Sequence, residues 1–192
     1  MPPRNDAALD FLLTRRSRPA KTLTAPAPDK TALVPILTAA ARSPDHGKLE
    51  PWRFVVIEGT ALARLAGLVR ERGAALGKTG EEIEKAQAQF LNSPLCVAVI
   101  ESPKVSPKIP EIEQTYSAGA VCLALLNAAL AAGWGANWLS GWASHDANFR
   151  KEGLNLAEHE RIAGLIHIGT ETSAPPERPR PDLEAITTWI SD

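Results

Sequence analysis

One long apolar segment constrains the fold of this chain more than any other feature of its sequence. Residues 118–132 read AGAVCLALLNAALAA, and Asn127 is the one polar side chain among them. Together with the residues from Glu111 onward, this segment predicts a long helix whose second half is apolar on every face and therefore buried on all sides. The segment is too short to span a bilayer. A chain of 192 residues has few places to bury such a helix, so we expect a second subunit to provide part of its cover.

The remaining residues predict a small sheet surrounded by helices, in the α+β class and within a single domain, residues 1–192. Asp6 and Asp29 are placed to cap the first two helices. The continuous apolar run at residues 95–100 is typical of a strand that is covered on both faces. Residues 134–142 form a short aromatic segment with glycines. The expected helices cover about 6–17, 29–42, 61–76, 81–91 and 111–132, the expected strands 52–57, 95–100 and 162–168, and a short amphipathic end 183–190.

Charge and cysteine content argue against several classes of function. Lys and Arg number 21 and Asp and Glu number 22, a balance that does not suit a protein holding nucleic acid or an anionic membrane over its whole surface. Cys96 and Cys122 lie far apart in apolar runs, so neither a disulfide scaffold nor a cysteine zinc site is predicted. The first residues lack a signal-peptide pattern. We therefore expect a cytoplasmic protein.

Several motifs of common enzymes are incomplete in this chain. Gly77-Lys78-Thr79 resembles the end of a phosphate-binding loop, but the required first glycine is replaced by Arg72. Gly133-Trp134-Gly135 begins like a dinucleotide-binding fingerprint, but Trp138 stands where the third glycine belongs. The chain also lacks a nucleophile elbow, and His159 and His167 have no evident ligand set. We therefore predict no catalytic side chain and no metal ligand.

A cluster of basic residues is the first positive indication of a binding site. Arg15, Arg16 and Ser17 stand at the end of the first expected helix, and Arg42 stands at the end of the second. Arginines at adjacent helix ends with a hydroxyl between them can bind a dianionic phosphate through charge-assisted hydrogen bonds. The alternative is a solvated helix end, where cations also suit the helix dipole.

An aromatic segment near the middle of the chain is the second indication. Trp138, Leu139 and Ser140 combine an aromatic ring and a hydroxyl at a turn that Gly141 follows. A flat, amphipathic cofactor needs apolar faces to stack on and a few directed donors.

The order of these pieces resembles that of the nitroreductase family of flavin enzymes, and the resemblance covers nearly the whole chain. The matching motifs are RRS at 15–17, PWRF at 51–54, SAG at 117–119, GWG at 133–135 and IGT at 168–170. The resemblance implies a small mixed or antiparallel sheet in an interlocked homodimer, with FMN held non-covalently at each of two subunit interfaces. It also implies reduction by NADH or NADPH, followed by ping-pong reduction of small oxidised substrates such as nitroaromatics or quinones.

The resemblance also assigns roles to individual residues. Arg15, Arg16 and Ser17 would hold the FMN phosphate and ribityl chain. Arg42 and His46 would contact the same cofactor, from the same subunit or from its partner. The remaining candidates are Trp138, Leu139 and Ser140, which would line the site, and Arg180, which would add a phosphate contact. The chain departs from the family pattern at Lys48, Glu50 and Leu139, where the family commonly has Asn, Gln and a polar or basic residue.

Two other functions remain open at this point. The first is an FMN-binding carrier or sensor without turnover. The second is an FMN-using enzyme that fragments or dehalogenates its ligand. Residues 73–90 bear on the second alternative, because such enzymes usually build a lid there. In this chain the region is rich in Gln, Glu, Lys and Ala and shows no substrate clamp.

Overall fold

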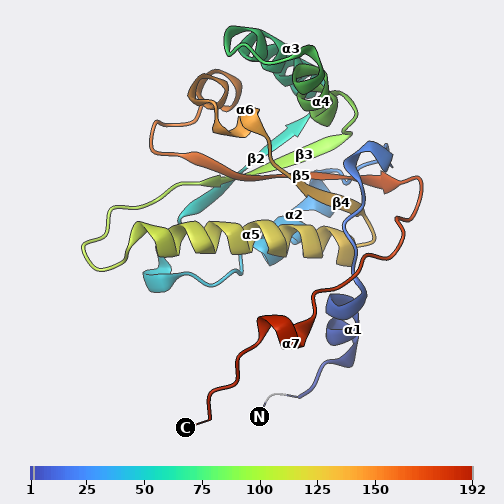
Figure 1. Ribbon diagram of the computed structural model, residues 1–192, viewed down its shortest axis with the longest axis vertical. Coiled ribbons are helices and arrows are strands. Elements are labelled where there is room, and N and C mark those ends of the chain that lie inside the picture. The colour runs from blue at the N-terminus through green and yellow to red at the C-terminus, as the bar shows by residue number, and fades with distance from the viewer. Residues whose placement is uncertain (2, 192) are drawn as a thin grey trace.

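An antiparallel sheet runs through the middle of the molecule, with helices on both of its faces (Figure 1). The computed structural model describes residue 1 and residues 3–191. Within these residues the sheet has five strands in the order β1-β5-β3-β2, and β4 pairs with β5. The expected α+β class and antiparallel sheet are thus confirmed. The strands are β1 (Leu23–Thr24), β2 (Trp52–Glu58), β3 (Leu95–Glu101), β4 (Gly135–Leu139) and β5 (Arg161–Glu171).

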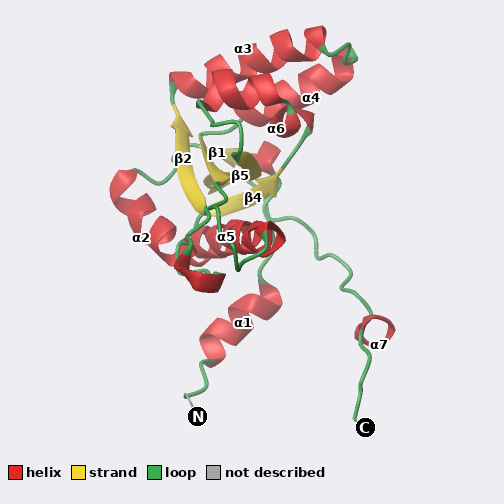
Figure 2. Cartoon of the chain, turned by 90° about the vertical axis from the view of Figure 1, so that its left-hand side faces the viewer, coloured by secondary structure: helices red, strands yellow, loops and turns green. Residues whose placement is uncertain are grey.

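The central strand β3 separates two hydrophobic clusters. Every residue of β3 is buried, as its continuous apolar sequence predicts. Because successive side chains of a strand point to opposite faces, Cys96, Ala98 and Ile100 join one cluster and Leu95, Val97 and Val99 join the other. Helices α3 (Thr60–Ala75), α4 (Gly80–Leu91) and α6 (Trp142–His145) lie on the first side, while α2 (Lys30–Ala40) and α5 (Glu111–Ala131) lie on the second (Figure 2).

Side-chain caps explain where several helices begin. The Asp29 carboxylate accepts a hydrogen bond from Ala32 N at 2.8 Å and starts α2, as expected. Thr79 and Glu82 form a capping box at the start of α4. Asn5, and not Asp6, caps α1 (Asp6–Thr14), because the Asn5 side chain accepts from Ala8 N at 3.1 Å.

The boundaries of three expected elements need correction. Helix α1 ends at Thr14, so Arg15 to Ser17 follow it with Arg15 in an extended conformation (ψ 143°). Residues 134–142, for which we expected an aromatic segment and no strand, contain β4, which pairs with β5 in the register Gly135 to Gly169. A Cβ atom at Gly135 would lie 2.6 Å from a methyl of Leu23, so glycine permits this close approach. The C-terminal helix α7 covers only Leu183–Ile186.

Helix α5 is buried on one side only within a single chain. Its inner residues, including Val121, Leu125 and Ala129, are fully buried against the sheet. Ile112, Tyr116 and Leu123 are 52%, 68% and 44% exposed. In the part of the chain that the structure describes, α5 alone has the length and apolar composition of a membrane span, and its buried inner face is that of a core helix. The apolar outer face is consistent with the expected second subunit, which stays a prediction.

Candidate functional site

The segment that carries the predicted phosphate ligands is fixed to the edge of the sheet. Arg18 N donates to Ala136 O at 2.8 Å, and Asn137 Nδ2 donates to Arg18 O at 2.7 Å. These two bonds join the chain after α1 to β4. Arg15, Arg16 and Ser17 are therefore held beside β4, although more than a hundred residues separate the two segments in the sequence.

A pocket of about 720 Å³ lies where this segment meets α5, β4 and the C-terminal arm. We call it the arginine pocket. Its volume falls in the range of roughly 300–1,000 Å³ that is usual for small-molecule sites. The pocket brings together five of the nine predicted cofactor residues: Arg15, Arg16, Ser17, Trp138 and Arg180. Sequence reasoning missed Arg178, Leu123 and Leu126, which also line it. The alternating arginines of the Pro-rich arm were the available signal for Arg178.

The arginine side chains of this pocket have unused hydrogen-bond donors. Within the described residues, the buried Nε atoms of Arg15 and Arg16 have no hydrogen-bond partner. Arg15 donates to Ser17 Oγ at 3.1 Å and Arg16 to Pro176 O at 3.0 Å, whereas Arg180 pairs with Glu177 at 2.9 Å. Buried donors without an acceptor are costly, and an anion that enters the pocket would supply acceptors.

The electrostatics of the pocket favour an anionic ligand. Burial, and then the charges of Arg180 and Arg16, lower the pKa of Arg15 from its usual value. Arg15 still carries its charge at neutral pH, because arginine is effectively always protonated. The arginines of this pocket are thus held close together, and among the described residues no carboxylate pairs with Arg15. Arg15 is half-buried, whereas a free helix end would leave it exposed; the role of the arginines as phosphate ligands stays a prediction.

The aromatic segment forms the end of β4. Trp138 is 37% exposed and its indole packs directly over Gly164 of β5, where a Cβ atom would collide with the ring. Leu139 follows half-buried, and Ser140 lies exposed just after the strand. The hydroxyl of Ser140 is 3.4 Å from His145 Nε2. Trp138 thus offers an apolar wall to the arginine pocket.

Arg42 and His46 lie apart from the arginine pocket in a single chain. Arg42 is exposed after α2, and His46 Nδ1 is 2.7 Å from Glu113 Oε2 in the first turn of α5. The pocket meets α5 at Leu123 and Leu126, and Leu123 lies ten residues further along, which is about 15 Å at the helical rise. Within one chain His46 is therefore well away from the arginine pocket, and Arg42 is not among the described residues that line it.

The loop around His46 adopts an unusual backbone. Gly47, Lys48 and Glu50 have positive φ angles of 77°, 54° and 48°. The Asp45 carboxylate accepts from Leu49 N at 2.9 Å and from Glu50 N at 3.1 Å and so holds the loop. Two of the departures from the family pattern, Lys48 and Glu50, therefore fall in a backbone region that favours Asn or Gly over other residues.

The two histidines for which we predicted no metal-binding role lie in different surroundings. His159 is exposed, and His167 is fully buried in β5. Among the described residues, no three His, Cys, Asp or Glu side chains lie close enough to hold a metal ion.

Comparison with solved structures identifies the fold as nitroreductase-like. A nitroreductase-like family protein from Bacillus cereus superposes with a TM-score of 0.80 at 25% identity, covering 99% of this chain and 98% of that one. A provisionally named nitroreductase from Desulfovibrio desulfuricans, solved in complex with FMN, gives 0.75 at 20% identity over 98% of this chain and 100% of its own. The FMN- and NADPH-dependent nitroreductase NfnB gives 0.72 at 20% identity over 96% and 99%. At such low identity the last two show the fold alone.

The chain belongs to the nitroreductase family, whose model matches residues 12–170. It is 36% identical over 163 residues to YdjA of Escherichia coli (strain K12), provisionally named an NAD(P)H nitroreductase, covering 85% of this chain and 87% of YdjA. A Haemophilus influenzae protein with the same provisional activity in its name is 37% identical over 167 residues, covering 85% and 88%.

Proposed function

We propose that this oxidoreductase uses non-covalent FMN to transfer electrons from NADH or NADPH to small oxidised substrates in a ping-pong cycle. Membership of the nitroreductase family supports the oxidoreductase class. One structural observation supports the cofactor: the arginine pocket, where Arg15 and Arg16 present buried donors without partners beside the Trp138 indole. A phosphate suits the arginines and a flat ring suits the indole.

The residues of this chain would bind and orient the cofactor. Arg15, Arg16 and Ser17 would donate to the phosphate and ribityl oxygens, and Arg180 would add a second cationic contact. Trp138, Leu139 and Ser140 would line the ring. Bound FMN supplies the hydride chemistry, so the protein needs no acid, base or nucleophile of its own. Cations near the cofactor would stabilise negative charge by preorganised electrostatics.

We further propose a cytoplasmic homodimer in which Arg42 and His46 reach the cofactor held by the partner subunit. The separation of His46 from the arginine pocket, about 15 Å along α5, and the absence of Arg42 from the described residues that line this pocket support this assignment. The exposed apolar side chains of α5 would lie in the interface. The family resemblance suggests nitroaromatics or quinones as substrates.

A titration tests the cofactor, and anaerobic reduction tests the activity. We expect the purified protein to bind one FMN per chain and the bound flavin to bleach on addition of NADH or NADPH without oxygen. Protein that shows no saturable FMN binding would contradict the whole proposal. If the bound flavin stays oxidised in an excess of NADH and of NADPH, the reductase function is contradicted and the carrier or sensor function is favoured. Loss of a leaving group from the substrate without use of the nicotinamide would favour the fragmentation alternative.

A substitution on α5 tests the dimer. Tyr116→Arg places a charge on the apolar outer face, 68% exposed in one chain, and desolvating that charge in an interface is costly. We expect the variant to become monomeric in sedimentation and to bind FMN at least about tenfold more weakly, since it loses Arg42 and His46 of the partner. Leu91→Arg, an equally apolar and exposed position (59%) at the end of α4, serves as the control. A dimeric Tyr116→Arg protein would place the interface elsewhere.

A further inference from the structure

A second pocket lies beside the candidate cofactor site, at the edge of the sheet. Strand β4 pairs with β5 from Leu165 to Gly169 and ends there, so the first residues of β5 lack this neighbour. A pocket of about 490 Å³ occupies the space between α5 and α6. We call it the β5-edge pocket. Its walls include Thr115 and Gly119 of α5, Ser144 and His145 of α6, Arg150, and Arg161 of β5.

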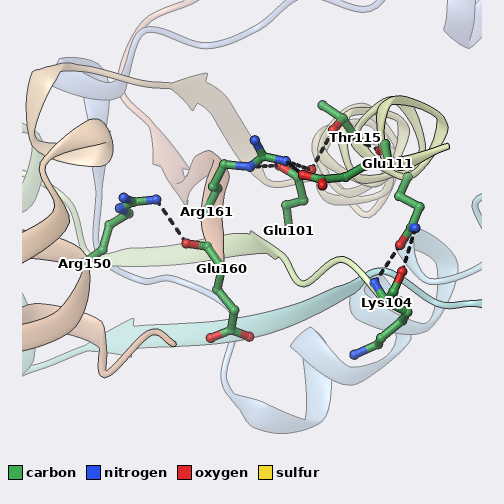
Figure 3. A network of polar contacts seen from close by, with 8 residues as sticks. Glu101, Lys104, Glu111, Thr115, Arg150, Glu160 and Arg161 are labelled. Carbon is green, nitrogen blue, oxygen red and sulfur yellow. Dashed lines mark hydrogen bonds and ion pairs between the residues drawn. The ribbon is translucent and has the colours of Figure 1, made fainter. Parts of the chain in front are cut away.

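Two donors in this pocket have no acceptor within the described residues. Ser144 is 2% exposed and its buried Oγ has no hydrogen-bond partner. The buried Nε of Arg150 also has none, and the guanidinium is held by one bond, from NH1 to Glu160 O at 3.0 Å (Figure 3). Buried polar groups are almost always paired, so two unpaired donors lining one pocket indicate a ligand that supplies acceptor oxygens.

The other charged groups around the pocket are already paired. Arg161 binds Glu101 through two bonds of 3.0 and 2.8 Å and also contacts Glu111, while Thr115 donates to Glu101 at 2.6 Å (Figure 3). Asp146, which follows α6, pairs with Arg72 at 2.9 Å, and the Glu160 carboxylate pairs with Arg53 at 2.7 Å. His145 is exposed. Arg150 is therefore the cation of this wall without a carboxylate partner among the described residues.

The pocket adjoins the proposed flavin site along two paths. The Ser140 hydroxyl, a candidate cofactor contact, is 3.4 Å from His145 Nε2, and His145 lines the β5-edge pocket. On α5, Gly119 lines this pocket and Leu123 lines the arginine pocket. Residues four apart lie on the same face of a helix, so the two pockets follow one another along α5.

We propose that the β5-edge pocket binds the carboxylate of the oxidised substrate, so that the preferred electron acceptors of this enzyme are small aromatic acids. The identification of the bound acid as the substrate rests on the proposed function, but the binding of a carboxylate in this pocket does not. The Arg150 guanidinium and the Ser144 hydroxyl donate to the carboxylate oxygens. An anion is favoured over a neutral acceptor, because a hydrogen bond between two charged groups is about twice as strong as a neutral one.

Binding of benzoate to the FMN-loaded protein tests the site without any electron transfer. Calorimetry should show benzoate binding more tightly than benzamide, its neutral counterpart. Arg150→Gln should weaken benzoate binding about tenfold and Ser144→Ala about threefold, and Arg150→Gln should weaken benzamide binding much less, because benzamide offers a neutral acceptor. Lys151→Gln is the matched control, since it removes the same charge from the next residue, which lies outside this pocket.

The Ser144→Ala variant separates a binding role from a structural one. Because the Ser144 hydroxyl has no partner within the described residues, its removal should leave the melting temperature unchanged while benzoate binding falls. Equal benzoate affinity in Ser144→Ala, Arg150→Gln and wild type would overturn the proposal. So would equal affinity for benzoate and benzamide, or an equal loss in Lys151→Gln.

Steady-state kinetics extends the test to turnover. The KM for 4-nitrobenzoate should rise about tenfold in Arg150→Gln, and the KM for 4-nitrobenzamide should rise much less. If benzoate binds as expected but the bound flavin is never reduced by NADH or NADPH, the proposed function fails and the anion site stands. If both nitro compounds are reduced with the same KM in wild type and Arg150→Gln, the assignment of the pocket to the substrate is wrong.

Discussion

Replacing Arg15 by alanine is expected to raise the dissociation constant of FMN by roughly ten- to a hundredfold while the dimer stays intact. The substitution removes a charge-assisted contact to phosphate, which contributes about 1.5–3 kcal/mol, and about 1.4 kcal/mol corresponds to a tenfold change in affinity. Arg15 is half-buried, and its one side-chain hydrogen bond within the described residues is to Ser17. Flavin fluorescence titrations of the apoprotein provide the measurement.

Riboflavin distinguishes a phosphate contact from general damage to the site. It has the flavin ring and no phosphate, so Arg15→Ala should weaken its binding much less than that of FMN. Arg70→Ala is the control for lost charge, because Arg70 is exposed on α3. An equal loss for both flavins, or no loss for either, would show that the arginines after α1 do not hold the phosphate.

Acidification from pH 7 to pH 5 is expected to lower the free energy of unfolding by about 2 kcal/mol through His167 alone. His167 is fully buried, and burial lowers its pKa to about 4. Ser93 Oγ donates to Leu95 O at 2.8 Å, so it accepts from His167 Nδ1 at 2.9 Å and fixes the neutral tautomer. His167 Nε2 faces the Cys96 thiol at 4.0 Å, and neither neighbour carries a negative charge that would offset the loss of hydration of an imidazolium.

The direction of this effect follows from the two pKa values. Well above pH 6.5 the histidine is neutral in both the folded and the unfolded chain, so it no longer makes the free energy of unfolding depend on pH. Below pH 6.5 the unfolded chain binds a proton that the folded chain does not bind until about pH 4, so stability falls through this interval. Urea unfolding at several pH values, with and without His167→Gln, isolates the contribution. If the free energy of unfolding of wild type and of His167→Gln changed with pH in the same way, the contribution of His167 would be refuted.

Local patterns in the sequence were enough to predict most of the scaffold. The apolar run of β3 determines a buried strand, and the apolar second half of α5 determines a helix whose inner face is buried, because these patterns are encoded within a few turns or residues. The cap at Asp29 also acts over three residues. The ordered motifs at 15–17, 51–54, 117–119, 133–135 and 168–170 were sufficient to predict the family.

Features that depend on distant segments required the tertiary structure. Strand β4 is stable because it pairs with β5, about thirty residues away, and its own sequence has too few β-forming residues to indicate a strand. The sequence could not indicate that α5 buries only one face in a single chain, because burial depends on what surrounds a helix.

The candidate site shows the same division. Its residue types follow from the sequence, since phosphate and a flat ring require cations, hydroxyls and an aromatic face. The structure alone shows that Arg180 meets Arg15 across the chain, that His46 is held at the other end of α5, and that Arg15 is half-buried with an unpaired Nε. Spacing along a chain specifies which groups are available, and only the folded backbone determines which of them share a pocket and are removed from water.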